Sequence, residues 1–140
     1  MRRIAFDLDE TLGVPLIDGT RMIGWQIRPG CHELLSQLRP KFVLCLWSVS
    51  SRSYVDKALS YGLGHYFAET YSWDELPAPW KDVRLIEADF LVDDNPQYRE
   101  SARDVGLESA YIVVPQYGSP EDAAEPLAWV RIVEARVVES

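Results

Sequence analysis

Short apolar runs alternate with amphipathic segments along the chain. Residues 3–6 and 42–47 contain almost only hydrophobic side chains, which is typical of strands buried on both faces of a parallel sheet. From Cys31 onward, apolar residues recur at helical spacing until Pro40 ends the pattern. The complete pattern predicts strands at 3–6, 42–47, 66–68, 88–92 and 110–114, and helices at 31–39, 52–61, 82–87, 96–105 and from 119 onward.

Turn-forming residues mark the boundaries between these elements. Asp18-Gly19 lies between apolar pairs within residues 14–27, which predicts a β-hairpin because both turn positions favour positive φ. Residues 72–80 hold two prolines and show no periodicity, so we expect a loop there. Ser119 is expected to start the last helical region, and Pro126 predicts either a kink in it or two separate pieces.

The alternation of strands and helices predicts an α/β fold with a parallel sheet of about five strands and helices on both faces. A length of 140 residues suits one domain, and we find no internal repeat. We therefore expect a single Rossmann-like domain over residues 1–140, with the hairpin of residues 14–27 as a small flap.

Composition and charge narrow the possible partners. The 14 basic and 22 acidic residues give a net charge of −8, which leaves nucleic acid possible but does not favour it. No apolar run approaches the roughly 20 residues of a membrane span, and the apolar start is too short for a signal-peptide core. Two cysteines and two histidines make a disulfide scaffold or zinc site improbable. We expect a cytoplasmic protein that does not bind membranes, and the sequence leaves its oligomeric state open.

Acidic residues gather at the expected carboxyl ends of two strands. Asp7 and Asp9 follow the first strand, and Asp93 and Asp94 follow the fourth. Ligands of such sheets bind at these strand ends, and carboxylates that converge there repel one another unless a cation is present. Oxygen ligands without histidine favour Mg²⁺. The alternative for the first motif alone is that Asp9 and Glu10 only cap a turn.

Two further residues suit the binding of a phosphoryl group. Ser48 lies between a strand and a helix start, where backbone N–H groups favour an anion, whereas Ser50 and Ser51 are expected to cap the helix. Lys81 leaves the irregular loop and could reach the carboxylates as a point charge for phosphate. These parts predict phosphoryl transfer, in which Asp7 attacks in line and Asp9 serves as general acid and base.

The four motifs resemble those of the haloacid dehalogenase (HAD) superfamily of phosphatases in their order along the chain: Asp7-Leu8-Asp9-Glu10-Thr11, Ser48, Lys81 and Asp93-Asp94. Finer detail is similar to the small capless members of the Fcp/Scp and magnesium-dependent phosphatase-1 types. The resemblance implies a phospho-aspartyl intermediate on Asp7 and Mg²⁺ as cofactor. It also implies that Thr11, Ser48 and Lys81 bind phosphate, and that Asp7, Asp9 (through its backbone carbonyl), Asp93 and Asp94 hold the metal.

The intervals between these motifs have no room for a cap domain, so we expect an open site. Such a site suits a phosphorylated macromolecule, either a peptide or a nucleic-acid end, or a small phosphate such as a sugar phosphate. Trp25, Arg52, Tyr54 and Trp80 are the possible substrate contacts, with packing in the core or loop as their alternative. A non-catalytic phosphate- or protein-binding module and a phosphotransferase are the competing functions, although the second normally needs a cap that excludes water.

Overall fold

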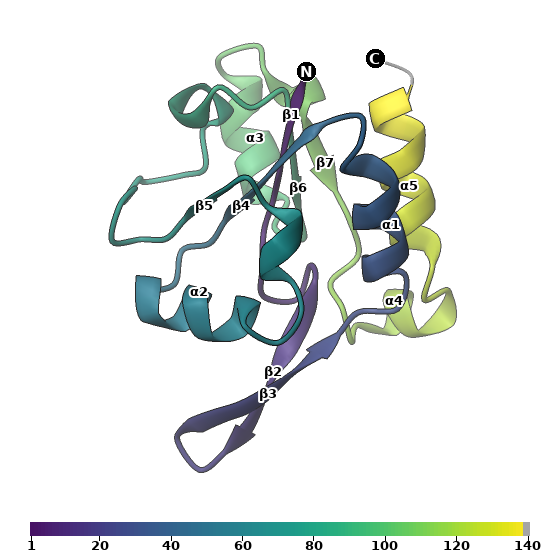
Figure 1. Cartoon of the computed structure of the whole chain (residues 1–140). Coiled ribbons are helices and arrows are strands. Elements are labelled where there is room, and N and C mark those ends of the chain that lie inside the picture. Colours follow the sequence, from purple (N-terminus) through teal and green to yellow (C-terminus); the bar gives the residue numbers. More distant parts are fainter. Residues whose placement is uncertain (139–140) are drawn as a thin grey trace.

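Five strands of the computed structural model form one sheet in the order β5-β4-β1-β6-β7, and all neighbouring strands in it are parallel (Figure 1). The structure describes residues 1–138. This sheet confirms the expected α/β Rossmann-like fold. Its strands are β1 (Arg3–Phe6), β4 (Val43–Trp47), β5 (Glu69–Tyr71), β6 (Phe90–Asp93) and β7 (Tyr111–Val113).

Helices cover both faces of the sheet, as expected. Alternate strand residues point to opposite faces, so Ile4 and Phe6 belong to one hydrophobic cluster and Ala5 to another. The first cluster packs against α1 (Cys31–Leu38), α2 (Arg52–Leu59) and α5 (Ala128–Val138), and the second against α3 (Gln97–Arg103) and the 3₁₀ turn η2 (Val83–Ile86). The shorter helical elements are η1 (Gly64–Tyr66), η3 (Glu108–Ala110) and α4 (Pro120–Ala124).

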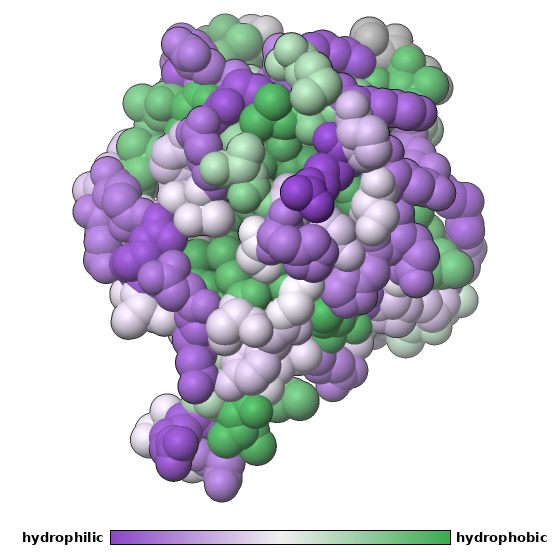
Figure 2. Space-filling model, in the orientation of Figure 1, coloured by the Kyte–Doolittle hydropathy of each residue, from purple (hydrophilic) through white to green (hydrophobic). Residues whose placement is uncertain are grey.

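The predicted hairpin is present and extends away from the sheet (Figure 1). It consists of β2 (Gly13–Asp18) and β3 (Arg21–Ile27), which pair antiparallel with Asp18 opposite Arg21. Gly19 in its turn has φ +63°, a conformation that glycine adopts without steric penalty. Hydrophobic atoms are visible at the surface of the projecting hairpin in Figure 2. The hairpin is the whole insertion between β1 and α1, so this interval holds no cap domain.

Two predicted elements are wrong. The strand expected at 66–68 lies instead at 69–71, because Tyr66 enters the core from the 3₁₀ turn η1 and the polar segment Glu69–Tyr71 pairs as an edge strand with β4. The helix expected at 82–87 is only the four-residue turn η2. Pro126 separates α4 from α5, which confirms the two-piece interpretation. Within residues 1–138, no helix is both long and apolar enough to cross a membrane.

The sheet register explains why distant polar residues meet. Phe6 pairs with Leu46 on β4 and with Val92 on β6. The three strands therefore end at the same edge, and the residues that follow or end them lie side by side there. The first motif, the Ser48 turn and the second acidic pair all come to this edge.

Candidate active site

Three carboxylates form a cluster at the carboxyl ends of β1 and β6. Asp7, Asp93 and Asp94 each offer an oxygen, and these oxygens lie within 4.8 Å of one another. Burial above all, together with the neighbouring carboxylate of Asp7, raises the pKa of Asp93 to about 6 and that of Asp94 to about 7. Acidic groups are therefore concentrated at this position, as predicted from the sequence.

Lys81 supplies the positive charge inside the cluster. Its Nζ donates to Asp7 Oδ1 at 2.8 Å and to Asp93 Oδ2 at 2.9 Å, and its side chain is only 3% exposed. Burial alone would lower the pKa of Lys81, but the two carboxylates raise it above its usual value, so the ammonium stays charged. The ring of Tyr98 on α3 lies 5.5 Å from Nζ and adds a cation–π contact.

The backbone at Lys81 is held by a residue that sequence reasoning missed. Tyr111 on β7 donates its hydroxyl hydrogen to the Lys81 carbonyl at 2.7 Å and accepts the N–H of Val83 at 2.9 Å. Trp80 packs against the Tyr111 ring with the ring centroids 6.1 Å apart. Trp80 therefore contributes to the support of Lys81, and it is not among the residues that line the cavity described below.

Ser48 begins the turn between β4 and α2. Its N–H donates to the Tyr71 carbonyl at 2.9 Å, and its Oγ accepts the N–H of Ser50 at 3.0 Å. The hydroxyl proton of Ser48 thus remains available for a phosphoryl oxygen. Ser51 caps α2 by accepting the Tyr54 N–H, which confirms its expected role, whereas Ser50 is not the cap.

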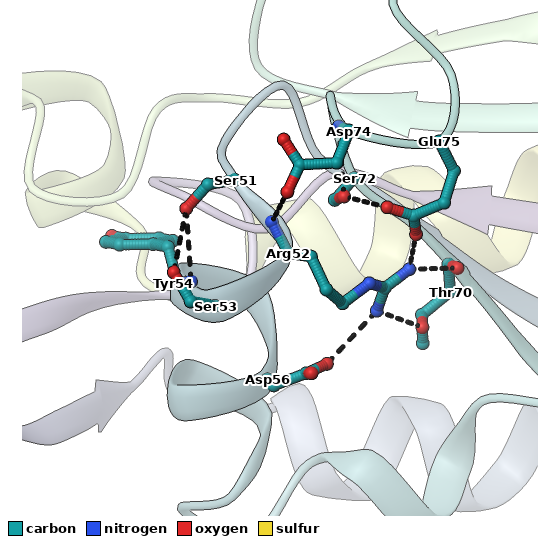
Figure 3. A network of polar contacts seen from close by, with 9 residues as sticks. All are labelled: Ser51, Arg52, Ser53, Tyr54, Asp56, Thr70, Ser72, Asp74 and Glu75. Carbon is teal, nitrogen blue, oxygen red and sulfur yellow. Dashed lines mark hydrogen bonds and ion pairs between the residues drawn. The ribbon is translucent and has the colours of Figure 1, made fainter.

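Arg52 ties this turn to β5 and to the segment that follows it (Figure 3). Its guanidinium donates to the Thr70 carbonyl at 2.8 Å and to Thr70 Oγ1 at 2.9 Å, and it forms ion pairs with Asp56 and Glu75. Its backbone N–H donates to Asp74. The guanidinium is thus occupied by protein groups, and Arg52 does not line the cavity.

Asp9 and Thr11 occupy different positions around the cluster. The Tyr54 hydroxyl donates to Asp9 Oδ1, and burial raises the pKa of Asp9 while this hydrogen bond opposes the rise. Thr11 is fully buried, and its Oγ1 lies 2.9 Å from Asp7 Oδ2 and 3.1 Å from Asp94 Oδ1. The hydroxyl of Thr11 therefore orients the carboxylates and is not directed into the cavity.

A cavity of about 180 Å³ opens above these groups. Trp25, on β3 of the hairpin, is only 6% exposed and packs in the core, and it is not among the residues that line this cavity. Sequence reasoning missed Asn95 and Tyr98 as residues of the site, although Asn95 directly follows the second acidic pair and Tyr98 comes shortly after it. The cavity is lined by Asp7, Asp9, Glu10, Ser48, Val49, Lys81, Asp93, Asp94, Asn95 and Tyr98.

The donor set fits a magnesium ion. The cluster within residues 1–138 consists of carboxylates alone, without histidine or cysteine, and hard oxygen ligands suit Mg²⁺. One lysine does not neutralise three carboxylates, so the cluster has room for a further cation. The residues that would hold it are Asp7, Asp93 and Asp94. The Asp9 side chain lies outside the cluster, which is compatible with a contact through its backbone carbonyl.

A buried arginine connects the loop of the first motif to the C-terminal segment. Arg28 is 1% exposed, and it donates to the Thr11 carbonyl at 3.2 Å and to the Pro115 carbonyl at 2.6 Å. It also pairs with Asp122 at 3.0 Å and lies 4.7 Å from the Trp129 ring. The loop that carries Asp9 is thus supported by residues more than a hundred positions later.

Comparison with known proteins places this geometry in a family. The family model of the NLI interacting factor-like phosphatases matches residues 3–97, the part of the chain that contains all four motifs. None of the curated proteins matches the sequence.

Solved structures share the fold at low sequence identity. A candidate β-phosphoglucomutase from Thermotoga maritima matches with a TM-score of 0.68 and 12% identity, covering 96% of this chain and 99% of that chain. A haloacid dehalogenase-like family hydrolase from Xanthomonas campestris has a TM-score of 0.66 and 11% identity, with coverage of 99% and 97%. Fcp1, an essential RNA polymerase II CTD phosphatase, has a TM-score of 0.65 and 16% identity; the match covers 99% of this chain but 50% of the Fcp1 chain.

Proposed function

Because the chain belongs to the NLI interacting factor-like phosphatase family of the HAD superfamily, we propose that it is a Mg²⁺-dependent phosphomonoester hydrolase that works through a phospho-aspartyl intermediate on Asp7. The observation that carries this proposal is the position of Lys81, whose Nζ lies between Asp7 and Asp93 at 2.8 and 2.9 Å. A charged lysine in contact with the nucleophile would receive the phosphoryl oxygens where negative charge develops.

The first half of the reaction forms the intermediate. A carboxylate oxygen of Asp7 attacks phosphorus, the bond from phosphorus to the leaving oxygen breaks, and Asp9 gives its proton to that oxygen. The hydroxyl of Ser48 donates a hydrogen bond to a phosphoryl oxygen, and Lys81 offsets the negative charge of the phosphoryl group. When bound, Mg²⁺ would neutralise the carboxylate cluster and stabilise the charge on the phosphoryl oxygens.

The second half releases phosphate. Asp9, now a carboxylate, accepts a proton from water as the water oxygen attacks phosphorus, and the bond from phosphorus to Asp7 breaks. Asp9 is thereby protonated again and Asp7 is regenerated. The raised pKa of Asp9, which results from burial, supports its use as an acid in the first half.

The surroundings of the cavity bear on the substrate. A second cavity of about 480 Å³ lies between the hairpin and α2, and Tyr54 lines it. This neighbouring space supports a substrate larger than phosphate, such as a phosphorylated peptide, a nucleic-acid end or a sugar phosphate. The net charge of −8 makes nucleic acid the least favoured of these.

The test measures hydrolysis of an aryl phosphate. The wild type is assayed with Mg²⁺ and with EDTA, and the Asp7→Asn variant is assayed with Mg²⁺. We expect turnover that requires Mg²⁺ and disappears in the variant. Asp18→Asn, which changes an exposed carboxylate on the hairpin, is the matched control and should retain activity. Turnover by Asp7→Asn would contradict the intermediate. Folded wild-type protein that neither turns over the aryl phosphate nor binds beryllofluoride in the presence of Mg²⁺ would favour the non-catalytic module instead.

A further inference from the structure

The hydrogen bond between Tyr54 and Asp9 joins α2 to the loop of the first motif, which follows β1, across 45 positions of the sequence. Asp9 lines the cavity of the candidate active site, whereas Tyr54 lines the neighbouring cavity between the hairpin and α2. Tyr54 is half-buried, and both burial and the Asp9 carboxyl raise its pKa above the usual value. The phenol hydroxyl donates this hydrogen bond, and Asp9 Oδ1 accepts it.

The network around the start of α2 holds Tyr54 in place (Figure 3). The Tyr54 N–H donates to Ser51 Oγ at 3.3 Å, which fixes the first turn of the helix. Arg52, which directly follows Ser51, anchors the same turn through Asp74 and Thr70. Tyr54 thus belongs to a helical turn whose backbone is held by the contacts of both Ser51 and Arg52. This rigid turn gives the Tyr54 hydroxyl a defined position.

The contact distinguishes the two oxygens of Asp9. A hydroxyl that donates to Oδ1 makes Oδ1 the acceptor, so the proton of the carboxylic acid resides on Oδ2. After this proton has left, Oδ2 is the oxygen without a protein donor among the described residues, and it can accept a proton from water. The same atom then serves both halves of the reaction.

We propose that Tyr54 is a positioning residue for Asp9, which occupies Oδ1 so that Oδ2 gives the proton to the leaving oxygen and later takes the proton from water. This inference rests on the proposed function and deepens it. The contribution of Tyr54 depends on the substrate, because a phenoxide or alkoxide leaving group needs a proton whereas a dinitrophenolate does not. Tyr54 therefore favours substrates with poor leaving groups.

The test compares kcat/KM for phenyl phosphate and 2,4-dinitrophenyl phosphate, since kcat/KM reports the steps up to formation of the bond to Asp7. General acid catalysis contributes about 10²–10⁴-fold, so we expect Tyr54→Phe to lower kcat/KM for phenyl phosphate about 10–100-fold. The value for dinitrophenyl phosphate should change by less than about threefold. Tyr61→Phe is the matched control: its hydroxyl donates to the Met22 carbonyl at 3.5 Å, and neither substrate should be affected.

A double-mutant cycle separates this role from a structural one. In the Asp9→Asn background, Tyr54→Phe should add no further dependence on the leaving group, because the acid it positions is already absent. Equal losses for the two substrates, or no loss for either, would overturn the proposal while leaving the phosphatase chemistry intact. Wild-type protein that turns over neither substrate and does not bind beryllofluoride in the presence of Mg²⁺ would instead overturn the proposed function. Thermal unfolding of each variant confirms that it is folded.

Discussion

Replacement of Lys81 by methionine removes the one positive side chain in contact with the carboxylate cluster among the described residues. Methionine keeps the length of the lysine stem and its apolar packing, so the main change is electrostatic. The side chains of Lys81 and Asp93 are 3% and 6% exposed, and their charged atoms lie 2.9 Å apart. In the variant, Asp7 and Asp93 therefore remain buried without their cation.

The size of the effect follows from this burial. Breaking a buried ion pair by removing one partner costs about 3–5 kcal/mol. The pKa values of Asp93 and Asp94, raised to about 6 and about 7, show that the cluster can take up a proton near neutral pH, which limits the loss. We therefore expect the free energy of unfolding of Lys81→Met to fall by about 3 kcal/mol, a large share of the total for a domain of this length.

Urea unfolding at neutral pH without divalent cations measures this loss. Lys41→Met is the control, because Lys41 is exposed and its replacement should change stability by less than about 0.5 kcal/mol. Adding Asp93→Asn to Lys81→Met should restore about 1 kcal/mol or more, since it removes one uncompensated charge. If Lys81→Met is as stable as Lys41→Met, the buried charges do not interact as the structure indicates.

Two further predictions concern buried groups away from the cavity. Arg28→Met should lower the free energy of unfolding by about 3–5 kcal/mol in urea titrations, because it leaves Asp122 buried without its partner. Recovery of stability in the double variant with Asp122→Asn would support this cause. An Arg28→Met variant with the unfolding midpoint of the wild type would contradict it. Burial raises the pKa of Cys31 to about 12 and raises that of Cys45, so the reactive thiolate is scarce at pH 8. Iodoacetamide should therefore modify Cys31 roughly a thousandfold more slowly in the folded protein than in urea, and the rate should rise only as the pH approaches 12. Mass spectrometry measures the modification, and equal rates in the folded and unfolded protein would refute the burial of the thiol.

The sequence predicts those parts of the fold whose signal is local. The apolar run before Asp7, the Asp-Gly turn and Pro126 each determine a nearby element, and the structure has all three. The edge strand β5 escaped prediction because its residues Glu69–Tyr71 are polar on an exposed edge, where apolar patterning is weak. The hydrophobic residues just before it have the stronger strand-like pattern, but they pack into the core from the 3₁₀ turn η1 and the residue that follows it.

The residues of the candidate active site likewise differ in how far the sequence could predict them. Residues at strand ends, such as Ser48 and Asp93, could be placed because parallel strands share one edge. The supports of these residues come from side-chain geometry across the fold: the contact of Tyr111 with the Lys81 backbone joins residues 30 positions apart, and no local pattern encodes it. The contacts of the Arg52 guanidinium likewise depend on Thr70, which belongs to the strand that the sequence pattern misplaced.

The long-range contacts of Arg28 also set an order of events during translation. The N-terminal part of a chain leaves the ribosome first, so Arg28 and the Thr11 carbonyl emerge well before Asp122 and Trp129 are made. Until those residues appear, the guanidinium lacks its acidic partner and its aromatic neighbour. A nascent chain that already contains every motif residue up to Asp94 therefore still lacks this support for the loop of the first motif until Asp122 and Trp129 have been made.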